Sequence, residues 1–225
     1  MVTHQDHTHK TLRFVLMALL LLILLVLQGP CAISTASEPN QQTIRYTIDP
    51  KQGKFIAHAF AGGLLWFQGH DHYLAARDFS GEVEANPQTV VPASLRLVVK
   101  AGSLEETSDD FTDQQKQIIN KEVRNIVLLP DKYPDIVFES TGVTAKQVKP
   151  GEFDVSVTGN LTLLGVTRRE TFPVKVHLSE NDLQAVGQFT INRGDYKVKA
   201  TSAAHGLISV KDKVRFEFDI VAHRK

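Results

Sequence analysis

Cysteine and net charge are what this sequence has least of. Its 225 residues include one cysteine, Cys31, and equal numbers of basic and acidic side chains, 25 of each. If Cys31 leaves with an N-terminal signal, the mature chain can form no disulfide, cysteine nucleophile or cysteine-based zinc site. A chain without a basic excess is also not expected to bind nucleic acid. Its 42% hydrophobic content separates it from disordered chains.

The signatures of common hydrolases are missing as well. The sequence contains no Gly-x-Ser-x-Gly elbow, no phosphate-cradling glycine loop and no His-Glu-x-x-His helix. Serine, histidine and aspartate are all present, but their presence alone does not indicate catalysis. We therefore expect a binding protein that needs no cofactor, and not an enzyme.

The N-terminus has the pattern of a secretory signal peptide, which we expect to span residues 1–36. Lys10 and Arg13 precede an uncharged apolar run over residues 14–27, and small residues follow up to Ala36. The run is shorter than the roughly 20 residues that a membrane-spanning helix needs. The pattern predicts export, to the periplasm or out of the cell.

Two alternatives to a cleaved signal stay open. An uncleaved segment would tether the chain to a membrane, and lipid attached to Cys31 would make it a lipoprotein, although Pro30 stands where such signals have a small residue. After the signal we expect a polar leader over residues 37–42 and one domain over residues 43–225. No later linker rich in proline, glycine or serine divides that domain.

Alternation of apolar and polar residues with a period of two dominates the domain and predicts about eight strands. Turn signals such as Asn86-Pro87 and Lys149-Pro150-Gly151 separate the runs. Short turns between successive strands favour an antiparallel meander, and closure into a barrel removes its exposed edges. Clear alternating sets are Leu95, Leu97 and Val99; Phe153, Val155 and Val157; Phe172, Val174 and Val176; and Val214, Phe216, Phe218 and Ile220.

One segment has helical spacing instead. Between Thr112 and Val127 the apolar residues fall on one helical face, and Thr112 with Gln115 forms a capping-box pattern. Pro130 closes the segment. The expected fold class is all-β with one inserted helix, as an antiparallel eight-stranded β-barrel.

Five fragments then stand in a specific order: residues 46–50 (YTIDP), 78–83 (DFSGEV), 131–141 (DKYPDIVFEST), 159–167 (GNLTLLGVT) and 191–196 (INRGDY). Together they resemble the YceI-like, polyisoprenoid-binding family of exported proteins, with residues 78–83 matching its second strand. The resemblance runs from about Tyr46 to Ala222. It implies a lipocalin-like barrel that holds an isoprenoid or fatty chain in its apolar bore. The sequence departs from the family pattern over residues 62–72 and at Lys197, where the family often has glycine.

An eight-stranded barrel is either filled by its own side chains or holds one small ligand. Strand parity leaves both readings open, and the resemblance favours a ligand such as an isoprenoid, a quinone or a fatty acid-like lipid. The alternative is an envelope interaction or stress module with a packed bore. The residues expected to line the bore are Phe79, Leu95, Leu97, Phe138, Phe153, Val155, Leu161, Phe189, Phe216 and Phe218.

His70 and His72 are candidate metal ligands. On an extended segment their imidazoles point the same way, about 7 Å apart, and imidazole suits zinc, copper and nickel. A third ligand is needed, for which Asp71, His58 and His205 are available. The alternative is a polar rim whose histidines bind only backbone or water.

Two further pairs carry alternatives. Arg193 and Asp195 share a face if their segment is extended, so Arg193 either binds an anionic head group or forms a structural pair at a bend. Trp66 and Phe67 follow a double glycine. They are expected to form a gate over the bore, to touch a membrane surface as a peripheral contact, or to belong to the core.

Overall fold

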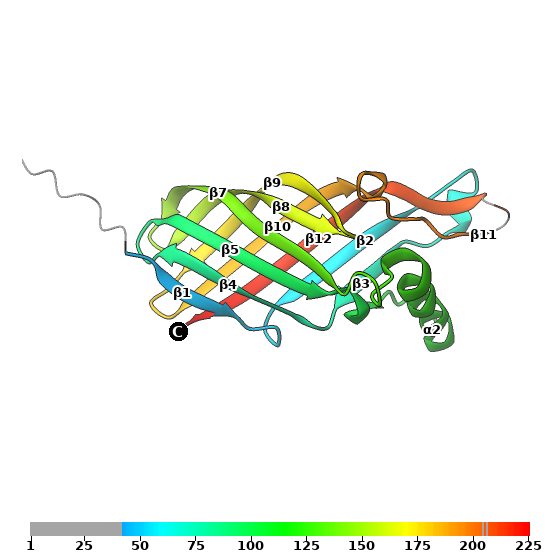
Figure 1. Ribbon diagram of the computed structural model, residues 1–225, viewed down its shortest axis with the longest axis horizontal. Coiled ribbons are helices and arrows are strands. Elements are labelled where there is room, and N and C mark those ends of the chain that lie inside the picture. Colours follow the sequence, from blue (N-terminus) through cyan, green and yellow to red (C-terminus); the bar gives the residue numbers. More distant parts are fainter. Residues whose placement is uncertain (1–41, 204, 206) are drawn as a thin grey trace, which may run out of the picture. The chain divides into compact units, whose positions relative to one another are not determined.

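The computed structural model describes residues 42–203, 205 and 207–225, most of which lie in antiparallel strands (Figure 1). The expected signal peptide, and all of the expected leader except Gln42, lie outside the described residues. The strands are β1 (Ile44–Ile48), β2 (Lys54–Gly62), β3 (His72–Ala76), β4 (Phe79–Asn86), β5 (Val90–Lys100), β6 (Leu104–Glu106), β7 (Asp135–Lys149), β8 (Glu152–Leu163), β9 (Val166–Leu178), β10 (Asp182–Asn192), β11 (Ser202–Ala203) and β12 (Ile208–Arg224).

Eight of these strands close into a ring. Their order is β1-β4-β5-β7-β8-β9-β10-β12, and β12 returns to pair with β1 through Tyr46↔Arg224 and Ile48↔Ala222. Closure pairs the edges that an open sheet would expose. The predicted antiparallel eight-stranded β-barrel is therefore confirmed.

The wall continues beyond this ring at one end. There β12 pairs with β2, from Ser209↔Gly62 to Asp219↔Lys54, and β3 and β6 follow β2 in the sheet. The strands β2 and β3 were not predicted from the alternation, because the inward positions of β2 include the small residues Ala57, Ala59 and Ala61 instead of an obvious apolar stripe. As a result, residues 79–83 of the fragment matched to a second strand lie in β4, the fourth strand along this chain.

The inserted helix forms where it was predicted. α2 (Asp113–Glu122) begins after Thr112, which accepts from the amide of Gln115 while the Gln115 side chain accepts from the amide of Thr112. A π-helical turn over Val123–Leu128 continues it, and it ends at Leu129 in the left-handed region. No helix within the described ranges is long and apolar enough to cross a membrane.

A two-residue turn joins β8 to β9. Leu164 and Gly165 both have positive φ, 50° and 72°, between the paired residues Leu163 and Val166. Such a turn follows the right-handed twist of the strands, and Gly165 adopts its conformation at no steric cost. This hairpin is one of the fragments that carried the family resemblance.

The core fills the inside of the ring. Every second residue is buried along β8 and along β9 from Phe172 to Leu178, which is the alternation predicted from sequence. Aromatic rings contact one another across the interior, with Phe172 at 5.3 Å from Phe138, 4.5 Å from Phe189 and 5.9 Å from Phe218 between ring centroids. Offset and edge contacts of this kind add stability beyond the area they bury.

The ring has a seam between β9 and β10. Their ladder runs from Leu183↔Leu178 to Gly187↔Val174 and stops there. Pro173, the next residue of β9, has no N–H to donate. Beyond the seam the strands are held by side chains, because the buried Tyr196 donates to Glu170 at 2.7 Å and Arg168 donates to the carbonyl of Asp195 at 3.3 Å.

Candidate functional site

Two cavities lie along the barrel interior. The inner one, about 90 Å³, is lined by inward residues of the ring strands and of β2, and Ser94 is its only lining residue with a polar side chain. Seven of the residues expected to line the bore line this cavity: Leu95, Leu97, Phe138, Val155, Leu161, Phe189 and Phe218. A space with this lining can exclude water and accept an apolar chain.

The remaining three expected residues lie elsewhere in the interior. Phe79 and Phe153 are buried in the core but line neither cavity. Phe216 lines the outer cavity, and its ring lies 5.0 Å from that of Phe189 in the inner one. Phe172 lines the inner cavity and was not singled out, although its alternation with its neighbours could have identified it.

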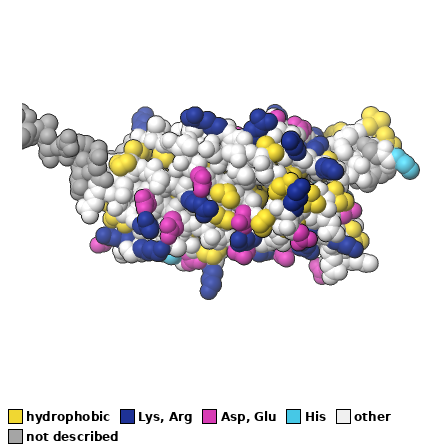
Figure 2. All heavy atoms as spheres, in the orientation of Figure 1, with side chains coloured by type: hydrophobic (Ala, Val, Ile, Leu, Met, Phe, Trp, Pro, Cys, Tyr) yellow, Lys and Arg dark blue, Asp and Glu magenta, His cyan; other side chains and the backbone are white. Residues whose placement is uncertain are grey.

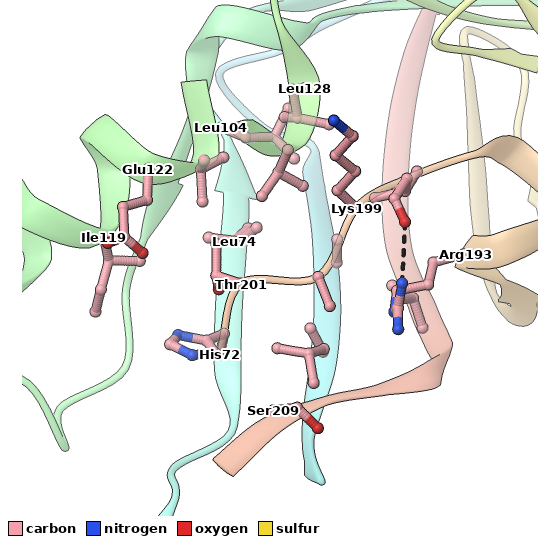
Figure 3. A pocket seen from close by; sticks show the side chains of 18 of the residues that line it. His72, Leu74, Leu104, Ile119, Glu122, Leu128, Arg193, Lys199, Thr201 and Ser209 are labelled. Atoms are coloured by element: carbon pink, nitrogen blue, oxygen red, sulfur yellow. Dashed lines mark hydrogen bonds between the residues drawn. The ribbon is translucent and has the colours of Figure 1, made fainter. Parts of the chain in front are cut away.

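The outer cavity, about 330 Å³, lies where β2, β3, β12, the helical segment and the chain after Val198 meet (Figure 3). Ile136 lines both cavities, so the two spaces meet there. The lining combines apolar and charged side chains. Among the apolar ones, Val123, Val127 and Leu128 come from the π-helical turn, and π-helical turns are often found at functional sites. The charged or titratable lining residues are His70, His72, Glu122, Arg193 and Lys199.

The charged side chains stand on opposite sides of the outer cavity. In Figure 3, Glu122 and His72 lie on one side, and Arg193 and Lys199 on the other. Lys199 and Glu122 were not predicted from sequence, because neither belongs to a recognisable motif. Together these groups give the outer cavity a polar rim, in contrast to the apolar inner cavity.

Arg193 and Asp195 would share a face if their segment were extended, but the segment is not extended. Residues Arg193–Tyr196 form a tight 3₁₀ turn after β10, so Arg193 and Asp195 do not share a strand face. The Arg193 guanidinium donates to the carbonyl of Val198 at 3.0 Å, drawn as a dashed line in Figure 3. It also donates to the carbonyl of Lys211 at 3.2 Å. Arg193 therefore fixes the chain segment that lines the outer cavity as well as lining it.

His72 is held by a buried carboxylate. Its Nδ1 lies 2.8 Å from Glu106, whose side chain is fully buried and accepts from the amides of Tyr73, Thr107 and Ser108. Burial alone would raise the pKa of Glu106, but the bonds from His72 and the amides outweigh it and lower that pKa. Nothing in the sequence marked Glu106, since it is 34 residues from its partner.

The other histidines are divided between separate partners. His70 is exposed and lies 3.9 Å from Asp110, whereas His58 contacts Asp71 at 2.9 Å. His70 and His72 both pack on Phe111 at the cavity wall. Within the part of the chain that the structure describes, no three His, Cys, Asp or Glu side chains gather into a metal-binding group. The third ligand that the metal prediction required is therefore not brought to His70 and His72.

Trp66 and Phe67 lie outside both cavities. They occupy a short 3₁₀ turn (Trp66–Gln68) between β2 and β3, where their side chains are 58% and 64% exposed. Neither lines the inner or the outer cavity, so they do not cover the bore in this structure. They are not core residues either.

Comparison with known proteins gives a consistent family. The YceI-like domain family matches residues 46–222. A UPF0312 protein of Pectobacterium carotovorum is 29% identical over 79% of both chains, and one of Enterobacter sp. (strain 638) is 30% identical over 58% of this chain and 60% of that relative, less than two thirds of its length.

Solved structures share the fold. Burkholderia cenocepacia BcnA superposes with a TM-score of 0.58 at 20% identity, covering 77% of this chain and 98% of that one. A polyisoprenoid binding domain from Saccharophagus degradans superposes with a TM-score of 0.56 at 14% identity, covering 81% and 99%. At these identities the likeness extends to the architecture alone.

Proposed function

The chain belongs to the YceI-like domain family, and from this premise we propose that it binds a lipid whose apolar chain occupies the inner cavity and whose polar end lies in the outer one. The observation that carries the proposal is the order of the two spaces. An almost wholly apolar cavity meets, at Ile136, a larger cavity with a charged rim. An amphiphile with one long tail has the same order of apolar and polar parts.

The apolar lining supplies the affinity. Each methylene that leaves water contributes about 0.8 kcal/mol, and the inner cavity offers it contacts with Phe138, Phe172 and Phe189. The name of the Saccharophagus domain, a polyisoprenoid binding domain, supports an isoprenoid tail. A quinone or a fatty acid-like lipid has the same apolar character and belongs to the same proposal.

The outer rim would receive the polar end. Lys199 and Arg193 on one side of the cavity are suited to an anionic or carbonyl oxygen. On the other side, His72 is oriented by Glu106 through Nδ1, and its Nε2 makes no hydrogen bond within the described residues. None of these roles requires a catalytic residue, so the protein is proposed to bind its lipid without transforming it.

Native mass spectrometry before and after organic extraction tests this proposal. We expect an extra mass that extraction removes, and its value identifies the lipid. Phe189→Asp places a charge in the inner cavity at a half-buried position, so the fold should survive while the extra mass disappears. The matched control is Ile118→Asp on the exposed face of α2, which should keep the lipid. A folded Phe189→Asp variant with full lipid content would contradict the proposal.

The alternative, an envelope interaction or stress module, predicts no extra mass and no uptake of added isoprenoid or fatty acid. It would need a bore closed by its own side chains. Export to the periplasm, or out of the cell, is part of the main proposal and is supported by the sequence pattern of residues 1–36. Cell fractionation with detection of the mature N-terminus tests it.

A further inference from the structure

Four large apolar side chains gather on two adjacent loops at the end of the barrel that lies opposite the C-terminus. Leu64, Trp66 and Phe67 lie between β2 and β3, and Leu207 directly precedes β12; they are 76%, 58%, 64% and 42% exposed. The loops are joined by a hydrogen bond from the amide of Leu65 to the carbonyl of Leu207, 2.9 Å long. Figure 2 shows hydrophobic side chains at this projecting end, and Figure 1 shows it opposite the C-terminus.

We propose that these four residues, here called the apolar tip, insert into the surface of an anionic lipid bilayer. Packing within the protein does not explain their exposure, because none of the four lines a cavity or belongs to the core. Large exposed apolar clusters mark interaction sites. A projecting tip that carries tryptophan, phenylalanine and leucine suits the interface of a bilayer, where tryptophan is enriched.

The charge around the tip selects the kind of surface. From Arg193 to Arg215 the chain carries six Lys or Arg and two Asp or Glu, although the whole chain has equal numbers. Asp71, just before β3, interacts electrostatically with Lys211 and offsets part of this excess. Lys211 from this segment lies over the Trp66 ring, with its Nζ 5.9 Å from the ring centroid. Basic residues held near an anionic leaflet are attracted to its head groups. This local excess is complementary to anionic head groups.

The tip also adjoins the entrance to the interior. Ile208, Ser209 and Val210, which follow Leu207, line the outer cavity, as does Ala61 beside Gly62. Docking through the tip would place the outer cavity next to the bilayer. The inference goes beyond the proposed lipid binding and does not depend on which lipid the bore holds.

The chain has one tryptophan, so its fluorescence reports on Trp66 alone. The mature protein, purified after export and free of residues 1–36, is mixed at low salt with vesicles of phosphatidylcholine and phosphatidylglycerol, with or without brominated acyl chains. We expect a blue shift of the emission and quenching by the brominated chains, both reversed by high salt because screening weakens the attraction. Reversal by salt separates docking from lipid captured in the bore. Residues 1–36 are left out because their apolar run over residues 14–27 would itself bind the vesicles.

Two variants keep the reporter and test its neighbours. Leu64→Ser combined with Phe67→Ser should weaken vesicle binding at least about tenfold, through loss of apolar insertion. Lys211→Gln should weaken it about fivefold, and only on anionic vesicles. Val148→Ser is the control and should have no effect, because Val148 is 54% exposed near the end of β7, where the ladders β7–β8, β8–β9 and β10–β12 place it at the C-terminal end of the barrel. Unchanged emission without quenching on anionic vesicles would overturn the inference, while leaving the extractable mass of the bore lipid as a separate result.

Discussion

Phe172 and Phe189 stack with their ring centroids 4.5 Å apart and their planes 14° from parallel, beyond the point where β9 and β10 stop pairing. The stack closes the inner face of the seam in the place of backbone hydrogen bonds. A groove on the outside of the same seam, at Pro173 and Gly187, shares Val155, Val174 and Phe218 with the inner cavity. At this point only these three side chains separate the groove from the inner cavity.

Phe189→Ala is expected to open a second path for ligand exchange at this seam, in addition to the path through the outer cavity. Removing one ring of the stack should raise the dissociation rate of a fluorescent fatty acid several-fold and cost about 1–3 kcal/mol of unfolding free energy, less than a fully buried Phe→Ala change. Stopped-flow displacement measures the rate. Phe79→Ala is the control: Phe79 is buried but lines neither cavity, so stability should fall without faster exchange. An unchanged rate in Phe189→Ala would show that the ligand leaves by another path.

Glu106→Gln should remove a source of acid sensitivity. The pKa of Glu106 is lowered in the folded protein, so its stabilising effect is fully present above the pKa of an unfolded Glu, about 4.3, and is lost as the pH falls through the folded-state value. Urea unfolding of wild type between pH 7 and 3 should therefore lose stability below about pH 4.3. The variant should be about 1–3 kcal/mol less stable at pH 7 and lose less on acidification.

Glu105→Gln is the control for this comparison. Glu105 is next in sequence but exposed, and it pairs with Arg77 at 3.3 Å. A surface pair of this kind contributes about 0–1 kcal/mol. If Glu106→Gln and Glu105→Gln change the loss of stability below about pH 4.3 equally, then the His72–Glu106 contact does not stabilise the fold in the way described.

Features that depend on neighbouring residues could be predicted from the sequence. The capping box of Thr112 and Gln115 and the alternation along β8 and β9 are local, because helix caps and strand faces repeat at fixed spacing. Ring closure followed from the need to pair edges. The strands β2 and β3, which were not predicted, carry alanine and histidine at inward positions. Their inward and outward residues therefore differ too little in hydrophobicity for the alternation to be recognised.

The site was harder to predict because its members meet only through the fold. Glu106 reaches His72 across the β3–β6 pairing, and Lys199 reaches the outer cavity from a segment without regular structure. The alternation along each strand identifies the side chains that point into the barrel. Which of these side chains line a cavity depends on how their neighbours pack, and the alternation does not show this. For the same reason Phe79 and Phe153 are buried without lining a cavity.

Lys197→Gly is expected to stabilise the protein. Lys197 ends the turn after β10 with φ at 59°, in the left-handed region. This conformation costs a residue with a Cβ about 1–2 kcal/mol. Glycine avoids this cost, but it also makes the unfolded chain more flexible, which offsets part of the gain in stability. Thermal or urea unfolding should show a gain of about 1 kcal/mol. The control, Lys213→Gly within β12, should instead lose about 0.5–1 kcal/mol, and a loss at both positions would contradict this explanation.

Ala59→Trp should close the outer cavity from within. Ala59 lies on the inward side of β2 and lines this cavity, so the added indole has about 330 Å³ to enter and need not displace the core. We expect a folded protein that takes up added fatty acid or isoprenoid far less than wild type, measured as the mass bound in native mass spectrometry. Ile56→Trp places the same side chain on the opposite face of β2, where it should leave uptake unchanged. Normal uptake by Ala59→Trp would mean that ligand reaches the inner cavity without crossing the outer one, and entry would then have to be sought at the Phe172–Phe189 seam.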